Sequence, residues 1–370
     1  MIKIDNIITY YPSFERGGIT KNLENFLNYC VKNKIKVSLI TENIAWKKSY
    51  NISKKVEIIK FKKKKTRFIP RRILSSFYSI SVIVQTLLRL KEKRLIFFSF
   101  QSNIIPIIFC KLLGVKIVIR NSEEIIGATK FADFKIFAYI IFFFKLIFYN
   151  FADGIIANSS KSKESLQKIL INKKKVKLLF NPYLTKIIKV PKKKKENLLL
   201  SIGRLCKQKN FETIIKAFYL FLKKKDNYKL VILGHGPKKE KLINLSKELK
   251  IIKKIKFKGW VSDTSVYLKK SKIFILSSLY EGLPNSLIDA VNYEIPSIST
   301  KCSGAEDILN FNKGVYFNFK DYKELAKKMN IMVNNYEKSV EKIKLSKLKI
   351  NRFFVKKQVE EYLKYLNNIA

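Results

Sequence analysis

The stretch KIFILSSLYEGLPNSLIDAV, residues 272–291, decides the fold class of this chain. KIFILSS is a short apolar run of the kind that forms a buried strand, and LYEGLP contains the glycine and proline of a loop. NSLIDAV opens with two good helix caps, Asn285 and Ser286. A strand that runs through a loop into a helix is the repeating unit of a parallel sheet covered by helices. Ligands of such sheets bind beyond the carboxyl ends of the strands, so we expect this loop to face a ligand.

Two carboxylates, Glu281 and Asp289, lie eight residues apart in this segment. Backbone amides at a helix start favour phosphate, whereas carboxylates repel it. The acids are therefore expected to accept hydrogen bonds from hydroxyl groups of the same ligand, which makes that ligand a nucleotide-sugar. Taken alone, the segment is more simply explained by a loop carboxylate at Glu281 and an acid at Asp289 that interacts with the helix dipole.

The same alternation extends over most of the chain. Helices with apolar residues on one face are predicted for 18–34, 210–225 and 237–251. The stretch 181–197 has two prolines and four consecutive lysines, which predicts a linker between two α/β domains. Further strands are predicted at 36–41, 94–100, 115–120, 154–159, 197–203, 228–234 and 254–259.

A second strand-to-helix loop, in LLLSIGRLCKQKNFETIIKAF (198–218), carries Gly203, Arg204 and Lys209. The two cations and the amides at the following helix start suit a diphosphate, and the arginine fork can bind two phosphate oxygens at once. In a chain this basic, solvent-facing cations explain the loop as well.

Glycines follow two further strands. Gly234 and Gly236 lie in LVILGHGP, and Gly17 and Gly18 lie between the first strand and the first helix. Each pair allows the backbone to approach a ligand closely, and each alone also fits a simple turn. We assign no catalytic role to His235, which lies between two of these glycines.

The chain has a formal net charge of +48, and only nine of its 76 basic residues are arginine. This charge favours anionic partners such as a bilayer, a nucleotide or a nucleic acid, without choosing among them. Four cysteines without CxxC spacing indicate neither a disulfide framework nor a zinc site, and no apolar signal-peptide core follows Met1. We therefore expect a cytoplasmic protein.

The stretch FADFKIFAYIIFFFKLIFYNF, residues 131–151, is about as long as a membrane span but contains Lys135 and Lys145. It is interpreted as a helix buried on one side. A core helix and a helix lying on lipid both remain open.

Together these motifs resemble glycosyltransferase family 4, retaining nucleotide-sugar-dependent enzymes of bacterial surface polysaccharide or lipid-linked glycan assembly. The likeness runs nearly end to end, and residues 277–309 are similar to the family's E-x7-E element. The resemblance implies an α/β protein of GT-B fold, with two facing Rossmann-like domains whose parallel sheets are covered by helices. We expect an acceptor-side domain at 1–185, a nucleotide-sugar-binding domain at 186–345, and a C-terminal helix at 346–370 that packs back on the first domain.

The resemblance also implies the roles of individual residues. Glu281, Arg204 and Lys209 would be catalytic, with both cations on the donor diphosphate and Glu281 on the transferred sugar. Asp289 stands where the family usually has a glutamate that holds the ribose. The remaining donor-binding residues would be Gly17, Gly18, Gly203, Gly234, Gly236, Trp260, Val261, Gly282, Leu283, Pro284 and Asn285.

Besides Asp289, three further departures from the family pattern are visible. Many members have a histidine after an N-terminal-domain strand, where this chain offers Arg120, Asn121 and Glu123 on the acceptor side. Asn210 replaces a frequent glycine after Lys209, a change expected to be minor. No DxD motif is present, so neither a metal nor another cofactor is expected.

The resemblance thus implies a glycosyltransferase that moves a hexose or N-acetylhexosamine from a nucleotide, which the family pattern indicates is UDP, to a lipid-linked or polysaccharide acceptor. Apolar residues at 67–90 and 131–151 favour a peripheral position on the inner face of the cell membrane. A GT-B nucleotide-sugar epimerase is an alternative, and a basic nucleic-acid-binding protein is another, although dispersed lysines argue against a nucleic-acid partner.

Overall fold

The computed structural model describes residues 4–13, 17–42, 51–62, 71–90, 94–190, 195–309 and 315–370, with the side chains of residues 71–73 left out. The chain forms two compact units. Unit 1 consists of residues 1–126, 136–185 and 352–370, and unit 2 of residues 127–135 and 186–351.

Unit 1 is built on a seven-stranded sheet in the order β3-β2-β1-β4-β5-β6-β7, and every adjacent pair in it is parallel. Its central strands read as continuous apolar runs because helices cover both faces of such a sheet. The strands are β1 (Asn6–Tyr10), β2 (Val37–Glu42), β3 (Glu57–Phe61), β4 (Leu95–Ser99), β5 (Ile117–Asn121), β6 (Gly154–Ala157) and β7 (Val176–Leu178).

Two apolar clusters lie on the two faces of this sheet. Neighbouring residues of one strand, Ile7 and Ile8, belong to different clusters because side chains alternate along a strand. The helices and 3-10 turns in this part of the chain are α1 (Gly18–Lys32), α2 (Arg71–Tyr78), α3 (Ile80–Arg89), α4 (Ile104–Leu112), α5 (Ile125–Lys130), α6 (Lys135–Phe148), η2 (Tyr149–Phe151), α7 (Ser160–Ile169), η3 (Lys173–Lys175) and α15 (Val355–Asn367).

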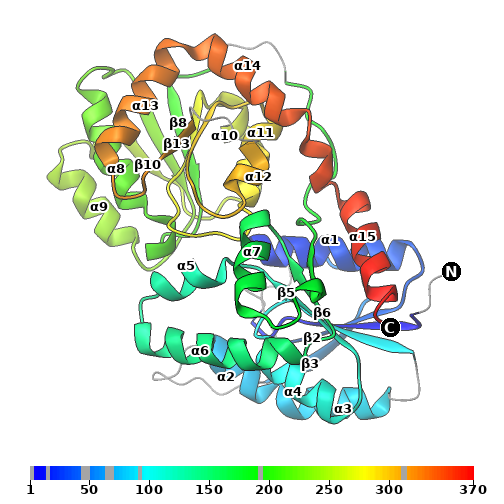
Figure 1. The fold of residues 1–370 in the computed structure, drawn as a ribbon. Helices are drawn as coiled ribbons and strands as arrows, with labels where there is room; N and C mark the ends of the chain where they lie inside the picture. The colour runs from blue at the N-terminus through cyan, green and yellow to red at the C-terminus, as the bar shows by residue number, and fades with distance from the viewer. Residues whose placement is uncertain are drawn as a thin grey trace. The chain divides into compact units, whose positions relative to one another are not determined.

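The C-terminal helix α15 packs against α1, and Figure 1 shows the red helix beside the blue one. Its Tyr362 lies in the same apolar cluster as Phe26 of α1 and Phe98 of β4. The backbone of Leu184 also bridges to Phe354 just before this helix. The end of the chain is therefore part of unit 1, as the sequence predicts, although its contribution begins at Arg352 rather than at residue 346.

Unit 2 contains a six-stranded parallel sheet in the order β10-β9-β8-β11-β12-β13. The strands are β8 (Leu198–Ile202), β9 (Lys229–Leu233), β10 (Ile255–Phe257), β11 (Ile273–Leu276), β12 (Ser297–Thr300) and β13 (Tyr316–Phe317). The helices and turns are η4 (Lys207–Lys209), α8 (Phe211–Leu222), α9 (Lys239–Glu248), η5 (Ile252–Lys254), α10 (Ser265–Lys270), α11 (Asn285–Asn292), α12 (Ala305–Leu309), α13 (Tyr322–Asn334), α14 (Tyr336–Lys347) and η7 (Ile350–Phe353).

The predicted fold class is confirmed, since each unit is a parallel sheet with helices between its strands. The chain passes from one unit to the other after Thr185, at the predicted boundary. A second crossing lies at residues 127–135, which belong to unit 2 although the sequence interpretation assigned them to the first domain. No amphipathic pattern marks this excursion, because it consists of the end of α5 and the short connection to α6.

The interpretation of residues 131–151 as one helix buried on one side is confirmed only in part: Phe142 of α6 packs partly buried against the core, and Tyr149 is buried. The segment divides into α6 and η2, and no residue of α6 is buried. In the other apolar stretch, α3 buries Ile83, Thr86 and Leu87 and is an ordinary core helix, while residues 67–70 lie outside the described residues. Among the described helices, none combines the length and the hydropathy needed to cross a bilayer.

Candidate active site

The candidate site lies where β8 and β11 end in unit 2. These strands are adjacent and parallel, with Ile273 opposite Leu199 and Phe274 opposite Leu200, so the loops that follow them emerge side by side. The strand order also changes direction here, because β9 lies on one side of β8 and β11 on the other. Such a switch point is the usual ligand-binding position in an open α/β sheet.

Lys209 and Glu281 meet at this point. Lys209 Nζ donates a hydrogen bond to Glu281 Oε1, and the two side chains are 18% and 9% exposed. Ser278 Oγ donates to the same carboxylate oxygen at 2.6 Å. The predicted phosphate-binding cation and the predicted sugar-binding acid therefore touch, and a charge-assisted bond shielded from water is stronger than one at the surface.

Hydrogen bonds tie the two loops to each other. Ser277 Oγ donates to the backbone oxygens of Lys209 at 2.7 Å and Asn210 at 3.0 Å. The amide of Leu279 donates to Gln208 O at 2.8 Å, and Gln208 Nε2 donates to Tyr280 O at 3.0 Å. The pair is thus held by a backbone scaffold rather than by flexible side chains alone.

Asn210 explains why a glycine is frequent after the lysine. It has φ 50° and ψ 44° at the start of α8, a left-handed conformation that asparagine tolerates better than most side chains. Its Nδ2 donates to Phe319 O at 2.9 Å, and Thr213 Oγ1 donates to its Oδ1 at 3.1 Å. These contacts support the expectation that replacing the glycine is a minor change.

The glycines of unit 2 serve close backbone packing. A Cβ on Gly234, where φ is +140°, would lie 1.9 Å from Gly203 O, and one on Gly236 would lie 2.4 Å from Leu205 O. Because these residues have no Cβ, the loop after β9 can pack directly against the loop that carries Arg204 and Lys209. Their contact partner is therefore protein backbone, whereas the sequence interpretation had them approach a ligand.

Gly304 is a supporting residue that the sequence interpretation missed. Its φ is +77°, and a Cβ there would lie 2.4 Å from Gly282 O and 2.8 Å from Leu283 Cα. The turn after β12 therefore packs directly on the turn after Glu281. A glycine shortly after an apolar strand, in the sequence STKCSGAED, was the available signal.

The other predicted donor-binding residues of unit 2 lie in the loops that follow its strands or in α11. Arg204 is exposed in the loop of Lys209, and Asp289 is half-buried in α11, which begins at Asn285 directly after Pro284. Trp260 is half-exposed and Val261 follows it. Gly259, immediately before Trp260, accepts a hydrogen bond from the amide of Gly234 at 2.6 Å, which links this stretch to the loop after β9.

The segment at residues 127–135 also reaches these loops. The ring of Phe131 lies parallel to that of Tyr280, with 6.4 Å between centroids, and edge-on to Phe319 at 5.4 Å. Lys207 Nζ donates to Ala132 O at 3.1 Å and lies 3.7 Å from Asp133 Oδ1. Sequence reasoning missed this contact because it treated residues 131–151 as one helix.

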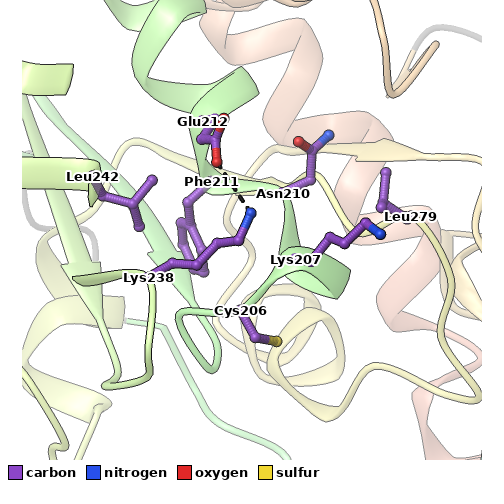
Figure 2. A pocket seen from close by; sticks show the side chains of 8 residues that line it. All are labelled: Cys206, Lys207, Asn210, Phe211, Glu212, Lys238, Leu242 and Leu279. Carbon is purple, nitrogen blue, oxygen red and sulfur yellow. Dashed lines mark hydrogen bonds and ion pairs between the residues drawn. The ribbon is translucent and has the colours of Figure 1, made fainter. Parts of the chain in front are cut away.

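A cavity of about 200 Å³ is lined in part by Cys206, Lys207 and Asn210 of the same loop (Figure 2). It is too small for a nucleotide-sugar, and Arg204, Lys209 and Glu281 do not line it. Within it Lys238 lies 3.2 Å from Glu212. Burial raises the pKa of Glu212, but hydrogen bonds from Lys238 and Lys241 outweigh this effect and lower the pKa below its usual value. The lining residues are Cys206, Lys207, Asn210, Phe211, Glu212, Lys238, Leu242 and Leu279.

Two predicted acceptor-side residues are interior groups of unit 1. Arg120 is 1% exposed, and its guanidinium donates to Tyr362 Oη at 3.3 Å, to Ser122 Oγ and to Asn181 Oδ1. Asn121 is buried and donates to the backbone oxygen of Glu123 and to Ser162 Oγ. The prediction that Arg120 and Asn121 face an acceptor is therefore wrong, because both side chains are buried and hydrogen-bonded to other residues of unit 1. Glu123 is half-buried in the loop that follows.

Gly17 and Gly18 begin α1 in unit 1. Gly17 has an extended backbone with φ 160°, and a Cβ built on it meets no atom within 4 Å. Protein packing therefore does not require glycine at this position, and its donor-binding role stays a prediction. Among the described residues, no group of three or more histidine, cysteine, aspartate or glutamate side chains could hold a metal ion.

Two Rossmann-like units, one with a cationic loop paired to a carboxylate at its switch point, define a glycosyltransferase of GT-B fold. Comparison with known proteins agrees. The family described as glycosyl transferases group 1 matches residues 184–348. The chain is 30% identical to an uncharacterized glycosyltransferase of Methanocaldococcus jannaschii, over 71% of this chain and 68% of that protein. The chain belongs to this family of glycosyltransferases.

Similarity extends over the whole length in another relative. The chain is 29% identical to the Campylobacter jejuni GalNAc-α-(1→4)-GalNAc-α-(1→3)-diNAcBac-PP-undecaprenol α-1,4-N-acetyl-D-galactosaminyltransferase, over 100% of this chain and 99% of that one. Among solved structures, HepE of Anabaena in complex with UDP and glucose has a TM-score of 0.80 at 14% identity, covering 98% of this chain and 99% of that chain. This last similarity supports the fold.

Proposed function

We propose that the chain is a retaining glycosyltransferase that moves a hexose or N-acetylhexosamine from a UDP-sugar to a lipid-linked or polysaccharide acceptor at the inner face of a membrane. The observation that carries the proposal is the contact between Lys209 and Glu281 at the switch point of unit 2. It joins a cation suited to phosphate with an acid suited to sugar hydroxyls, and a nucleotide-sugar is the ligand that contains both groups.

In this proposal the cations of unit 2 bind one part of the donor, and the acids bind another. Arg204 and Lys209 neutralise the diphosphate together with the amides at the start of α11. Glu281 accepts hydrogen bonds from hydroxyl groups of the transferred sugar, Asp289 from the ribose, and the stretch at Trp260 faces the base. Donor binding then turns Lys209 from the carboxylate toward phosphate, so the ion pair is a feature of the ligand-free state.

The chemical step exchanges one bond for another at the anomeric carbon. The bond from that carbon to the phosphate oxygen breaks and the electron pair leaves with UDP, while the acceptor hydroxyl oxygen bonds to the same face. The acceptor proton passes to the departing phosphate oxygen. Arg204 and Lys209 stabilise the charge on the leaving group by electrostatic preorganisation, without a metal ion.

The acceptor class comes from the relatives. Two Campylobacter jejuni proteins similar to this chain are named as transferases acting on diphospho-undecaprenol-linked sugars, and a Salmonella typhimurium relative as a lipopolysaccharide 1,6-galactosyltransferase. Family membership favours transfer over the epimerase and nucleic-acid-binding alternatives.

The test is the stereochemistry of the product. The purified chain is incubated with UDP-hexoses, UDP-N-acetylhexosamines and short polyprenyl-diphosphate saccharides, with and without a metal chelator, and the new linkage is assigned by NMR. We expect the anomeric configuration of the donor to be kept and the rate to survive chelation. An inverted linkage, or sugar interconversion without an acceptor, would contradict the proposal.

A further inference from the structure

Helix α6 packs one side against the core through Phe142 and exposes a broad apolar surface on its other side. Eight large apolar side chains from α6 and the turn after it are 41–77% exposed. With about 200 Å² for each aromatic side chain, roughly half of it exposed, the patch is on the order of 800 Å². Soluble monomers rarely expose so large an apolar area without a partner. The eight residues are Ile136, Phe137, Tyr139, Ile140, Phe143, Phe144, Ile147 and Phe151, and together they form the α6 surface.

The length of α6 restricts how it can meet lipid. Its 14 residues extend about 21 Å, whereas the hydrocarbon core of a bilayer is about 30 Å thick. The helix is thus too short to span a bilayer. An apolar helix with lysines at its ends and no acid between them matches segments that lie in the membrane interface.

Charge around the α6 surface points to an anionic partner. Between residues 134 and 151 the only charged side chains are Lys135 and Lys145. The neighbouring carboxylates are already paired: Asp153 lies 3.6 Å from Lys116 and also contacts Lys111, and Asp133 lies 3.7 Å from Lys207.

The cationic character continues beyond the end of α6. The amide of Ile171 donates to Asn150 Oδ1 at 2.9 Å, and Lys175 Nζ donates to Asn150 O at 3.1 Å. These bonds hold η3, with its three consecutive lysines, beside the end of the α6 surface, and Ile171 itself is 90% exposed. Apolar side chains next to lysines complement a bilayer with anionic headgroups.

A second copy of the chain is a poorer match for this surface. In a symmetric dimer the same patch faces itself, so the lysines of both copies would be brought together without acids to neutralise them. We propose that the α6 surface docks into the interface of an anionic bilayer and that η3 contacts its headgroups. The proposal deepens the proposed function, on which it rests for the position of the acceptor lipid.

Vesicle cosedimentation tests the proposal with matched variants. The full chain is mixed with phosphatidylcholine vesicles with and without phosphatidylglycerol. The triple variant Phe137→Ser, Ile140→Ser and Phe144→Ser removes apolar area from the α6 surface. The control variant Ile331→Ser, Leu345→Ser and Leu348→Ser removes apolar side chains of unit 2 that are 51–77% exposed, compared with 43–52% for the first set. We expect binding to phosphatidylglycerol vesicles to weaken about 100-fold in the first variant and to stay unchanged in the second.

The charge contribution is tested in the same assay. Lys173→Gln with Lys174→Gln should weaken binding about tenfold, and the exposed pair Lys323→Gln with Lys327→Gln should leave it unchanged. The proposal is overturned if the unsubstituted protein does not bind the vesicles, or if the α6 triple variant binds them as strongly as the unsubstituted protein does. A lipid-free dimer that the triple variant converts to a monomer also overturns it, since a second copy would then cover the surface.

A single substitution tests the proposal independently of whether the triple variant folds. Tyr139→Trp should show a blue-shifted emission that brominated lipids quench, measured against the background of the unsubstituted protein, while Leu345→Trp should show neither. An unquenched Trp at position 139 overturns the proposal. UDP binding, followed by thermal shift, separates the two hypotheses: its loss with vesicle binding intact overturns the proposed function alone.

Discussion

Lys209 and Glu281, 72 residues apart in the chain, form an ion pair that is largely shielded from solvent and shares a carboxylate oxygen with Ser278 Oγ. The pair joins the loops after two adjacent strands, and it joins the two chemistries that recognition of a nucleotide-sugar requires. Four predictions follow from its surroundings, each with its own measurement.

The first prediction concerns stability without ligand. Lys209→Ala leaves the Glu281 carboxylate buried without its cation, so the free energy of unfolding should fall by about 3 kcal/mol. Adding Glu281→Gln should recover part of this loss, because a neutral amide is less costly to bury. Chemical denaturation of the single and double variants measures the coupling.

Lys241→Ala is the control for the comparison of the single and double variants. Lys241 is 65% exposed and lies 3.3 Å from Glu212, so its removal should cost no more than about 0.5 kcal/mol. Equal losses for both lysine variants would show that the pair at Glu281 has no special energetic role.

The second prediction separates Arg204 from Lys207, a neighbouring cation in the same loop. UDP at 100 times its dissociation constant should stabilise the unsubstituted protein by about 2.7 kcal/mol. Arg204→Ala should reduce that gain strongly while changing ligand-free stability little, because Arg204 is exposed. Lys207→Ala, in the same loop, is the control and should retain the gain. A similar response to UDP in all three proteins would remove Arg204 from the donor site.

The third prediction assigns Ser278 as a positioning residue. Its side chain is buried, its Oγ holds Glu281 at 2.6 Å, and its backbone oxygen accepts from Thr300 Oγ1 at 2.6 Å. Ser278→Ala should cost about 1 kcal/mol of stability and should weaken binding of a UDP-sugar more than binding of UDP. Calorimetric titration with both ligands measures the difference. A purely structural role would weaken both to the same extent.

The fourth prediction compares two glycines. Gly304→Ala places a Cβ 2.4 Å from Gly282 O at a positive φ, so it should destabilise unit 2 by about 2 kcal/mol or more and disturb the turn after Glu281. Gly17→Ala meets open space in an extended backbone and exchanges only a favourable N-cap residue of α1 for a poorer one, so it should cost no more than about 1 kcal/mol. Its effect on UDP-sugar affinity then tests whether a ligand uses that space. Unchanged affinity would leave Gly17 without a donor-binding role.

The sequence predicted most of unit 2 because its signals are local. Apolar runs followed by glycine, proline and helix caps predict the strands and the loops that carry Arg204, Lys209 and Glu281. Parallel strands place their carboxyl ends on one edge of a sheet, so these loops were predictable as neighbours. Arg120 and Asn121 were misjudged for the opposite reason: their surroundings depend on Tyr362, Asn181 and Ser162, which are distant in sequence.

By itself, then, the sequence determined the two parallel α/β units and the loops that carry Arg204, Lys209 and Glu281, since periodicity and turn chemistry act over a few neighbouring residues. Tertiary structure alone decided three matters: Lys209 contacts Glu281, the Arg120 side chain is buried, and the apolar side chains on one face of α6 are exposed to solvent. Each depends on whether another element approaches. An apolar helix has the same pattern whether protein covers it or not, and only packing distinguishes a core helix from an exposed surface.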